Sequence, residues 1–183
     1  IARGACFERL SSGGLEVHSY DGERVHCRPQ VTHASEAASA AEMDYVLWAT
    51  KAHQMAESAS SVAALLGPST RVVPLQNGLP FWFFHGFGAQ LEGQTFTSSD
   101  ATCWQAVHPS RVIGCVSFVA GEVDHSQQPY GRWLSKWPAS RSSLAFGELA
   151  ARDGAAAAGS VGLLANLFEG SQPPLISVQR LAD

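Results

Sequence analysis

Four positions in this sequence lie at the ends of apolar runs, and three of them carry groups that suit a ligand with phosphate or carboxylate groups. They are Arg3 after Ile1-Ala2, Lys51 after Asp44–Thr50, Asn77 after Arg71–Leu75, and Ala120 at the end of Val112–Ala120. Arginine and lysine provide cations for phosphate or carboxylate, and an asparagine amide offers both a donor and an acceptor. Lys51 and Lys136 are the only lysines among the 12 basic residues, so the position of Lys51 is informative.

Each of these residues also has a purely structural interpretation. Arg3 suits a solvated loop, Lys51 the first residue of a helix, and Asn77 an Asn-Gly turn. A cation is unfavourable at a helix N-terminus, which favours a ligand-binding role for Lys51. In dinucleotide-binding folds an acid after the second strand binds the ribose hydroxyls of NAD, whereas an arginine accommodates the 2′-phosphate of NADP. Arg3 stands at that position, so NADP is the cofactor that the residues favour.

The elements expected around these positions alternate between strand and helix. Asp44–Thr50 and Arg71–Leu75 are continuous apolar runs, typical of strands buried on both faces. Between them, His53–Leu66 has helical spacing, and Val112–Ala120 is the next strand. This order predicts an α/β protein with a Rossmann-like, doubly wound and mostly parallel sheet. In such sheets ligands bind outside the carboxyl ends of the strands.

The rest of the chain is expected to form smaller elements. We predict a helix over Ala5–Ser12, a hairpin of Leu15–Tyr20 and Glu23–Arg28 around Asp21-Gly22, helical turns over Ser35–Glu42, an aromatic helix over Phe81–Phe84, a long loop over residues 86–110, antiparallel strands within 122–147, a helix over Ala155–Phe168, and a strand over Leu175–Ser177. Within this scheme Arg132–Ser143, which contains Lys136, is expected to be a surface loop.

Composition and motif searches exclude several classes of protein. With 45% hydrophobic and 15% charged residues, the chain is too apolar to be intrinsically disordered, and its net charge of -4 does not suit a basic nucleic-acid binder. No apolar run reaches the length of a membrane span. The cysteines are scattered, without a C-x-x-C pair, and the histidines form no H-x-x-x-H pair, so no metal site is predicted. No G-x-S-x-G nucleophile motif occurs.

Several motifs resemble those of ketopantoate reductases (2-dehydropantoate 2-reductases). The resemblance is carried by Ile1–Ala5 (IARGA), Trp48–Gln54 (WATKAHQ), Pro74–Leu79 (PLQNGL) and Arg111–Val116 (RVIGCV) with Ala120, and more weakly by Phe146–Leu149 (FGEL). It implies an NADPH-binding Rossmann domain and the reduction of ketopantoate to pantoate in pantothenate biosynthesis. By position, Arg3 would contact the 2′-phosphate side of the cofactor and Lys51 would be the cofactor-binding lysine. Asn77 would hold the nicotinamide end and the substrate, and Ala120 would line the cofactor site through its backbone.

Two parts of the family pattern are not found in the sequence. There is no G-x-G-x-x-G fingerprint, and the lysine that the resemblance implies as the catalytic proton donor would lie beyond Asp183, so no catalytic residue is assigned. We therefore expect residues 1–183 to be a partial NADP-binding domain that lacks its first strand, its glycine loop and the helical substrate domain. Such a chain would be poorly stable and have little or no reductase activity. For the whole protein we expect a cytoplasmic location and the possibility of a homodimer.

Two other functions stay open at this point. One is a related NAD(P)-dependent dehydrogenase that acts on another 2-oxo or 2-hydroxy acid, for which the same logic of strand ends would hold. The other is a non-catalytic relic or interaction domain. Binding of NADPH would support a reductase or a related dehydrogenase over a relic or interaction domain.

Overall fold

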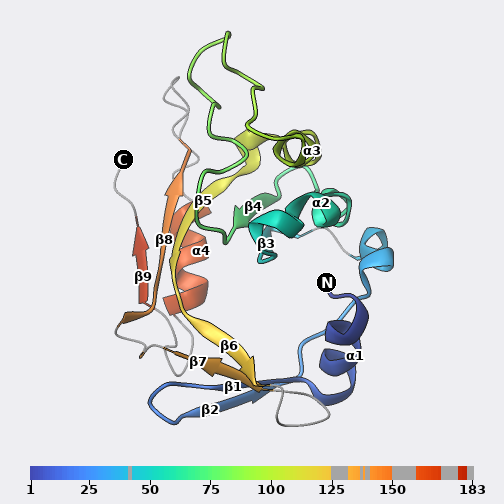
Figure 1. The fold of residues 1–183 in the computed structure, drawn as a ribbon, viewed down its shortest axis with the longest axis vertical. Helices are drawn as coiled ribbons and strands as arrows, with labels where there is room; N and C mark the ends of the chain where they lie inside the picture. The colour runs from blue at the N-terminus through green and yellow to red at the C-terminus, as the bar shows by residue number, and fades with distance from the viewer. Residues whose placement is uncertain are drawn as a thin grey trace.

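The computed structural model of the 183-residue chain describes residues 1–40, 43–124, 132–136, 138, 141–149, 160–169 and 177–180. The helices are α1 (Gly4–Gly13), α2 (Met55–Ala63), α3 (Ser98–Ala106) and α4 (Ser160–Glu169), with short 3-10 helices η1 (Ala34–Ser39), η2 (Ala52–Gln54) and η3 (Pro109–Arg111). The strands are β1 (Leu15–His18), β2 (Arg24–Cys27), β3 (Tyr45–Trp48), β4 (Arg71–Pro74), β5 (Ile113–Phe118), β6 (Gly121–Asp124), β7 (Arg132–Ser135), β8 (Ser143–Glu148) and β9 (Ser177–Arg180). Figure 1 shows their arrangement.

The centre of the fold is the parallel pair β3 and β4, which α2 connects. Their register pairs Tyr45 with Arg71 and Trp48 with Pro74. Neighbouring residues of β4 face opposite sides: Val72 packs in the cluster with α2, whereas Val73 packs in the cluster with α4. Both valines are fully buried. A strand covered by helices on both faces is the feature that defines a doubly wound sheet, so the predicted fold class is confirmed.

A second set of strands extends this centre. β5 begins beside β4 through a parallel bridge between Val72 and Val112, and β8 then pairs with β5 antiparallel and with β9 parallel. Helix α4 lies against this sheet, where Leu164 packs with Phe146 and Ile113 (Figure 1). The predicted antiparallel strands toward the carboxyl end are therefore present. Of the predicted helix over Ala155–Phe168, residues 160–168 are helical and 155–159 lie outside the described residues.

The lower part of the molecule is a four-stranded sheet in the order β2-β1-β7-β6. The predicted hairpin is correct: β1 and β2 pair antiparallel, and Gly22 in its turn has a φ of 88° that favours glycine. Helix α1 lies on the opposite side of the molecule from β5 and β8 (Figure 1). Just before α1, the backbone of Ala2 pairs with Thr32 and Ala34, which fixes the direction in which the chain reaches Arg3.

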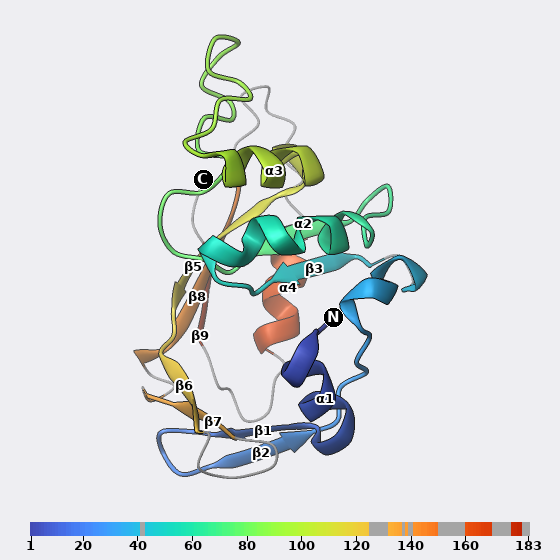
Figure 2. The same cartoon turned by 45° about the vertical axis from the view of Figure 1, so that its right-hand side comes forward.

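Four local expectations are wrong. Phe81–Phe84 does not form a helix but a series of turns, followed by Gly86 and Gly88 at positive φ. The long loop predicted over residues 86–110 contains α3, which lies beside α2 (Figure 2). The surface loop predicted over Arg132–Ser143 begins with β7. Finally, β3 is not buried on both faces, because Leu47 is 43% exposed between the buried Val46 and Trp48.

Candidate functional site

The carboxyl ends of β3 and β4 are held together by one side chain, Gln76. Its Nε2 donates to the carbonyl oxygens of Trp48 and Thr50, both at 2.8 Å. The Trp48 carbonyl also accepts a hydrogen bond from the backbone N–H of Leu75, at 3.1 Å. Because Thr50 directly precedes Lys51, Gln76 fixes the backbone from which that lysine projects.

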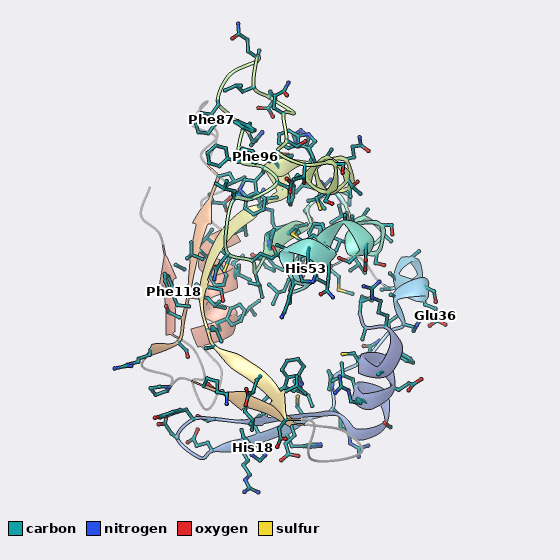
Figure 3. The ribbon with its side chains drawn as sticks, viewed as in Figure 1. His18, Glu36, His53, Phe87, Phe96 and Phe118 are labelled. Carbon is teal, nitrogen blue, oxygen red and sulfur yellow. The ribbon has the colours of Figure 1, made fainter. Side chains whose placement is uncertain are left out.

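A small cavity lies directly beside this clamp. Its walls are Ala52 of η2, the short helix that also carries His53 (Figure 3), Met55 at the start of α2, residues 76–82 after β4, and Ser99, Asp100 and Cys103 of α3, and its volume is about 50 Å³. That is room for a few water molecules, since one water needs about 10–15 Å³ of such space. Most of the residues that line the cavity are apolar, and it is too small to enclose a dinucleotide.

Asn77 is the one predicted site residue among those lining this cavity. Its Nδ2 donates to the carbonyl oxygen of Ser117 at 2.8 Å, and its Oδ1 accepts from the Ser117 N–H at 3.1 Å. The amide thus ties the end of β4 to β5. An asparagine amide has four hydrogen-bonding positions, and this link uses two of them, so one N–H and one lone pair remain for a ligand. The following Gly78 has a φ of 108°, which turns the chain sharply at this point.

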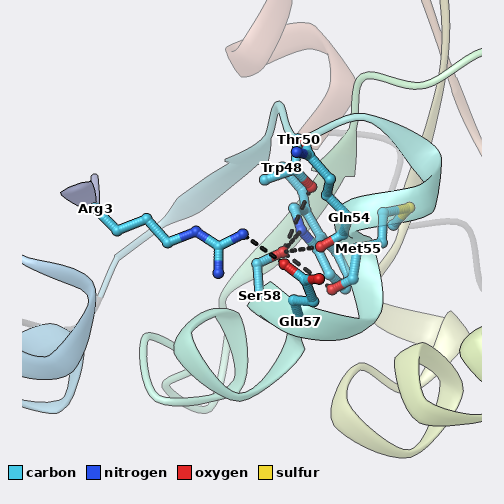
Figure 4. Close-up of polar contacts among 7 residues, drawn as sticks. All are labelled: Arg3, Trp48, Thr50, Gln54, Met55, Glu57 and Ser58. Carbon is cyan, nitrogen blue, oxygen red and sulfur yellow. Dashed lines mark hydrogen bonds and ion pairs between the residues drawn. The ribbon is translucent and has the colours of Figure 1, made fainter. Parts of the chain in front are cut away.

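Lys51 lies at the start of η2, with extended backbone angles, and is exposed. Within the part of the chain that the structure describes, its ammonium group has neither an ion pair nor a hydrogen bond. The turn that carries it is held from the helix side by Ser58, whose hydroxyl accepts from Trp48 Nε1 at 2.8 Å and donates to the Met55 carbonyl at 3.0 Å (Figure 4). Lys51 is therefore a free cation on a firmly held turn.

Arg3 approaches the same region from the other end of the chain. Its Nη2 lies 2.6 Å from Oε2 of Glu57 in the first turn of α2, and both side chains are more than half exposed (Figure 4). Sequence spacing alone does not predict this pair, because the two residues are 54 positions apart. The structure thus places Arg3 at the first turn of α2, the helix that follows Lys51 and η2.

Ala120 lies farther from these groups. It is half-buried between β5 and β6, and its carbonyl oxygen accepts from the N–H of Lys136 at 2.8 Å. Lys136 in turn pairs with Glu122 at the surface. Ala120 is not among the described residues that line the cavity.

The ionisable groups in the cavity wall are Asp100 and Cys103. Asp100 forms a capping box with Thr97 at the start of α3, where its carboxylate accepts from the Thr97 N–H and hydroxyl. Burial raises the pKa of the Cys103 thiol to about 11, and the charge of Asp100 adds to this rise. The Cys103 thiol is therefore not poised to exchange a proton near neutral pH.

The residues that sequence reasoning missed are those that support the site: Glu57, Ser58, Gln76 and Asp100. One local signal was available, because Thr97-Ser98-Ser99-Asp100 has the spacing of a capping box before a helix. Glu57 and Gln76 act through contacts with distant residues, and Ser58 bonds residues within ten positions of it.

The donors in this region suit an anionic dinucleotide. Arg3 and Lys51 are exposed cations near the carboxyl edge of the parallel strands, which is where phosphate groups bind in doubly wound folds. Among the described residues, no cluster of three or more histidine, cysteine, aspartate or glutamate side chains has the geometry to hold a metal ion. In the same residues, no helix is both long and apolar enough to cross a membrane.

Comparisons with known proteins agree with this arrangement. The family model described as ketopantoate reductase PanE/ApbA matches residues 1–81. A curated 2-dehydropantoate 2-reductase from Mesorhizobium japonicum is 41% identical over 126 residues, which are 68% of this chain and 38% of that protein. The match therefore covers well under half the length of that relative.

Solved structures of similar proteins agree with these matches. A protein from Ralstonia solanacearum MolK2, named as a candidate ketopantoate reductase, is 27% identical with a TM-score of 0.74, over 98% of this chain and 51% of that one. A D-mandelate dehydrogenase solved with NADH and anilino(oxo)acetate is 13% identical with a TM-score of 0.63, over 97% of this chain and 46% of that one, and shows the shared fold alone. The family match, the curated relative and the Ralstonia structure agree that this chain is similar to ketopantoate reductases.

Proposed function

We propose that this chain binds NADPH and that the whole protein uses it to reduce the C2 ketone of 2-dehydropantoate to pantoate. The observation that carries the proposal is the convergence of Lys51, Gln76 and Asn77 at the carboxyl edge of β3 and β4, in a chain similar to ketopantoate reductases. This edge is the place at which a doubly wound fold binds a dinucleotide.

The cations would hold the phosphate end of the cofactor. In the proposal, Arg3 receives the 2′-phosphate, because a guanidinium fork can bond two phosphate oxygens at once, and Lys51 provides a second point charge nearer the cavity. Ala120 contributes backbone at the end of β5. When bound, NADPH supplies the hydride for the reduction.

Asn77 would act at the other end of the cofactor. Its remaining N–H and lone pair are available beside the cavity, where they suit the carboxamide of a nicotinamide ring and the oxygen of a 2-oxo acid. Since the cavity volume is only about 50 Å³, the dinucleotide would lie along the open strand ends, with one end at the cavity mouth.

The proton that the reduced ketone needs has no evident donor in the cavity wall. Asp100 caps α3, and burial holds the pKa of Cys103 at about 11. Because general acid catalysis contributes about 10²–10⁴-fold, we propose that residues 1–183 bind the cofactor but turn over substrate slowly at best. Normal turnover of ketopantoate by this chain would contradict that part of the proposal.

Fluorescence titration with NADPH tests the binding proposal, with three variants compared to the native chain. Lys51→Ala and Asn77→Ala should each weaken binding about 10- to 100-fold, as expected for the loss of a hydrogen bond to a charged group or of a buried ligand contact. Lys136→Ala is the matched control, because Lys136 is the other lysine and pairs with Glu122 at the surface. No binding of NADPH by the native chain would favour a relic or interaction domain.

The nature of the oxo acid is a separate question. A related dehydrogenase of another 2-oxo or 2-hydroxy acid would need the same cations and the same strand ends. Turnover of the whole protein on 2-dehydropantoate, compared with other 2-oxo acids, distinguishes the two. A cytoplasmic location and a homodimer of the whole protein belong to the same proposal, and its oligomeric state is measurable by sedimentation.

A further inference from the structure

We propose that Glu57 is a specificity-determining residue, because its carboxylate competes with the 2′-phosphate of a dinucleotide for the guanidinium of Arg3. The inference rests on the proposed function, and it goes beyond that function by assigning the choice between NADPH and NADH to a pair of residues. In this view the Arg3–Glu57 pair sets how strongly the protein prefers the phosphorylated cofactor.

The geometry brings this pair together from two fixed backbones. Ala2 is hydrogen bonded to Thr32 and Ala34 immediately before Arg3, and Glu57 is in the first turn of α2. Between them, Arg3 Nη2 and Glu57 Oε2 are 2.6 Å apart, a short charge-assisted hydrogen bond (Figure 4). The side chains keep 57% and 62% of their surface exposed, so a ligand can reach both groups.

Arg3 and Glu57 are the two residue types by which such folds usually distinguish NADP from NAD. A carboxylate after the second strand accepts from ribose hydroxyls and suits NAD, whereas an arginine there receives the 2′-phosphate of NADP. Here Arg3 follows Ala2, which forms a parallel bridge with His33, and Glu57 provides the acid from another element. A 2′-phosphate would have to displace Glu57 from the guanidinium and would then lie close to its negative charge. A ribose hydroxyl would meet no such repulsion.

A weaker interpretation is that Glu57 merely stabilises α2. An acid in the first turn of a helix is favourable, and an exposed ion pair contributes little to stability. In that case the ratio of NADPH affinity to NADH affinity would not depend on Glu57. This ratio therefore distinguishes a role in specificity from a role in stability.

The experiment measures dissociation constants for NADPH and NADH by fluorescence titration at low ionic strength. In Glu57→Gln the ratio of NADPH to NADH affinity should rise about 10-fold, since a negative charge within a few ångströms of a phosphate dianion is removed. In Arg3→Ala the ratio should fall by a similar factor. Both effects should shrink at 0.5 M salt, where screening is stronger.

Glu122→Gln is the matched control, because Glu122 is an exposed carboxylate that pairs with Lys136, the residue directly after β7. It changes the net charge by the same amount and should leave the ratio unchanged. If Glu57→Gln alters the ratio less than two-fold while both cofactors bind, the inference is wrong and the proposed function stands. If neither cofactor binds to the native chain, both are wrong.

Discussion

Replacing Gln76 with leucine tests whether one side chain holds the candidate site together. Gln76 Nε2 makes two hydrogen bonds of 2.8 Å, to the carbonyls of Trp48 and Thr50, and these bonds are partly buried. Leucine has a similar size but offers no donor. The substitution therefore removes the two side-chain bonds between the ends of β3 and β4 and keeps the backbone bond from Leu75 to Trp48.

The loss in the free energy of unfolding depends on which hydrogen-bond partners the two carbonyls keep. The Trp48 carbonyl keeps its bond from the Leu75 N–H, whereas the Thr50 carbonyl keeps no described protein partner and would have to turn to water. With a net value of about 0.5–1.5 kcal/mol for each bond, we expect the free energy of unfolding to fall by about 2 kcal/mol. For a chain of this size that corresponds to a Tm about 4–8 °C lower.

Urea denaturation followed by circular dichroism measures this change. Gln90→Leu is the matched control, because Gln90 is exposed in a turn and its side chain makes no described hydrogen bond. Gln76→Glu should be more damaging than leucine at pH 7, since a carboxylate would face two carbonyl oxygens. If Gln76→Leu stays within 0.5 kcal/mol of the native chain, or if Gln76→Glu is the milder of the two, the clamp does not have the role assigned to it.

Two further predictions concern α3 and the thiols. Thr97→Ala removes the capping box with Asp100, so the free energy of unfolding should fall by about 1 kcal/mol in urea denaturation, and an unchanged midpoint would contradict this. Burial raises the pKa of Cys103 and of Cys115 to about 11, so both stay protonated in the folded protein below that pH. At pH 8 a thiol reagent should modify the exposed Cys27 quickly and these two only on unfolding; fast labelling of all of them in the folded protein would refute the assignment.

Much of the fold could be predicted because its signals are local. The apolar run of β4, the spacing of α2 and the Asp21-Gly22 turn each depend on residues close together in the chain, and the structure confirms all three. The predicted strand ends also place Lys51 and Asn77 next to the turn that forms the cavity.

Other elements could not be predicted from local sequence signals. Helix α3 has little segregation of apolar residues onto one face and buries only Cys103, so its composition looks like a loop although its capping box is local. Conversely, Phe81–Phe84 follows Pro80 as the start of a helix would, but aromatic residues are weak helix formers, and the segment forms successive turns that end at Gly86 and Gly88 with positive φ. The exposure of Leu47 depends on which elements cover β3, which periodicity does not encode.

The residue types at the ends of the strands can be read from the sequence, and they predict a site for an anionic dinucleotide. How those residues are held, and what they compete with, depends on contacts that form only in the folded chain. Gln76 ties β3 to β4, Asn77 ties β4 to β5, and Glu57 meets Arg3 across 54 positions of sequence. Hydrogen bonds and ion pairs depend on distance in space, and separations of this length in the chain are brought to 2.6–2.8 Å only by folding.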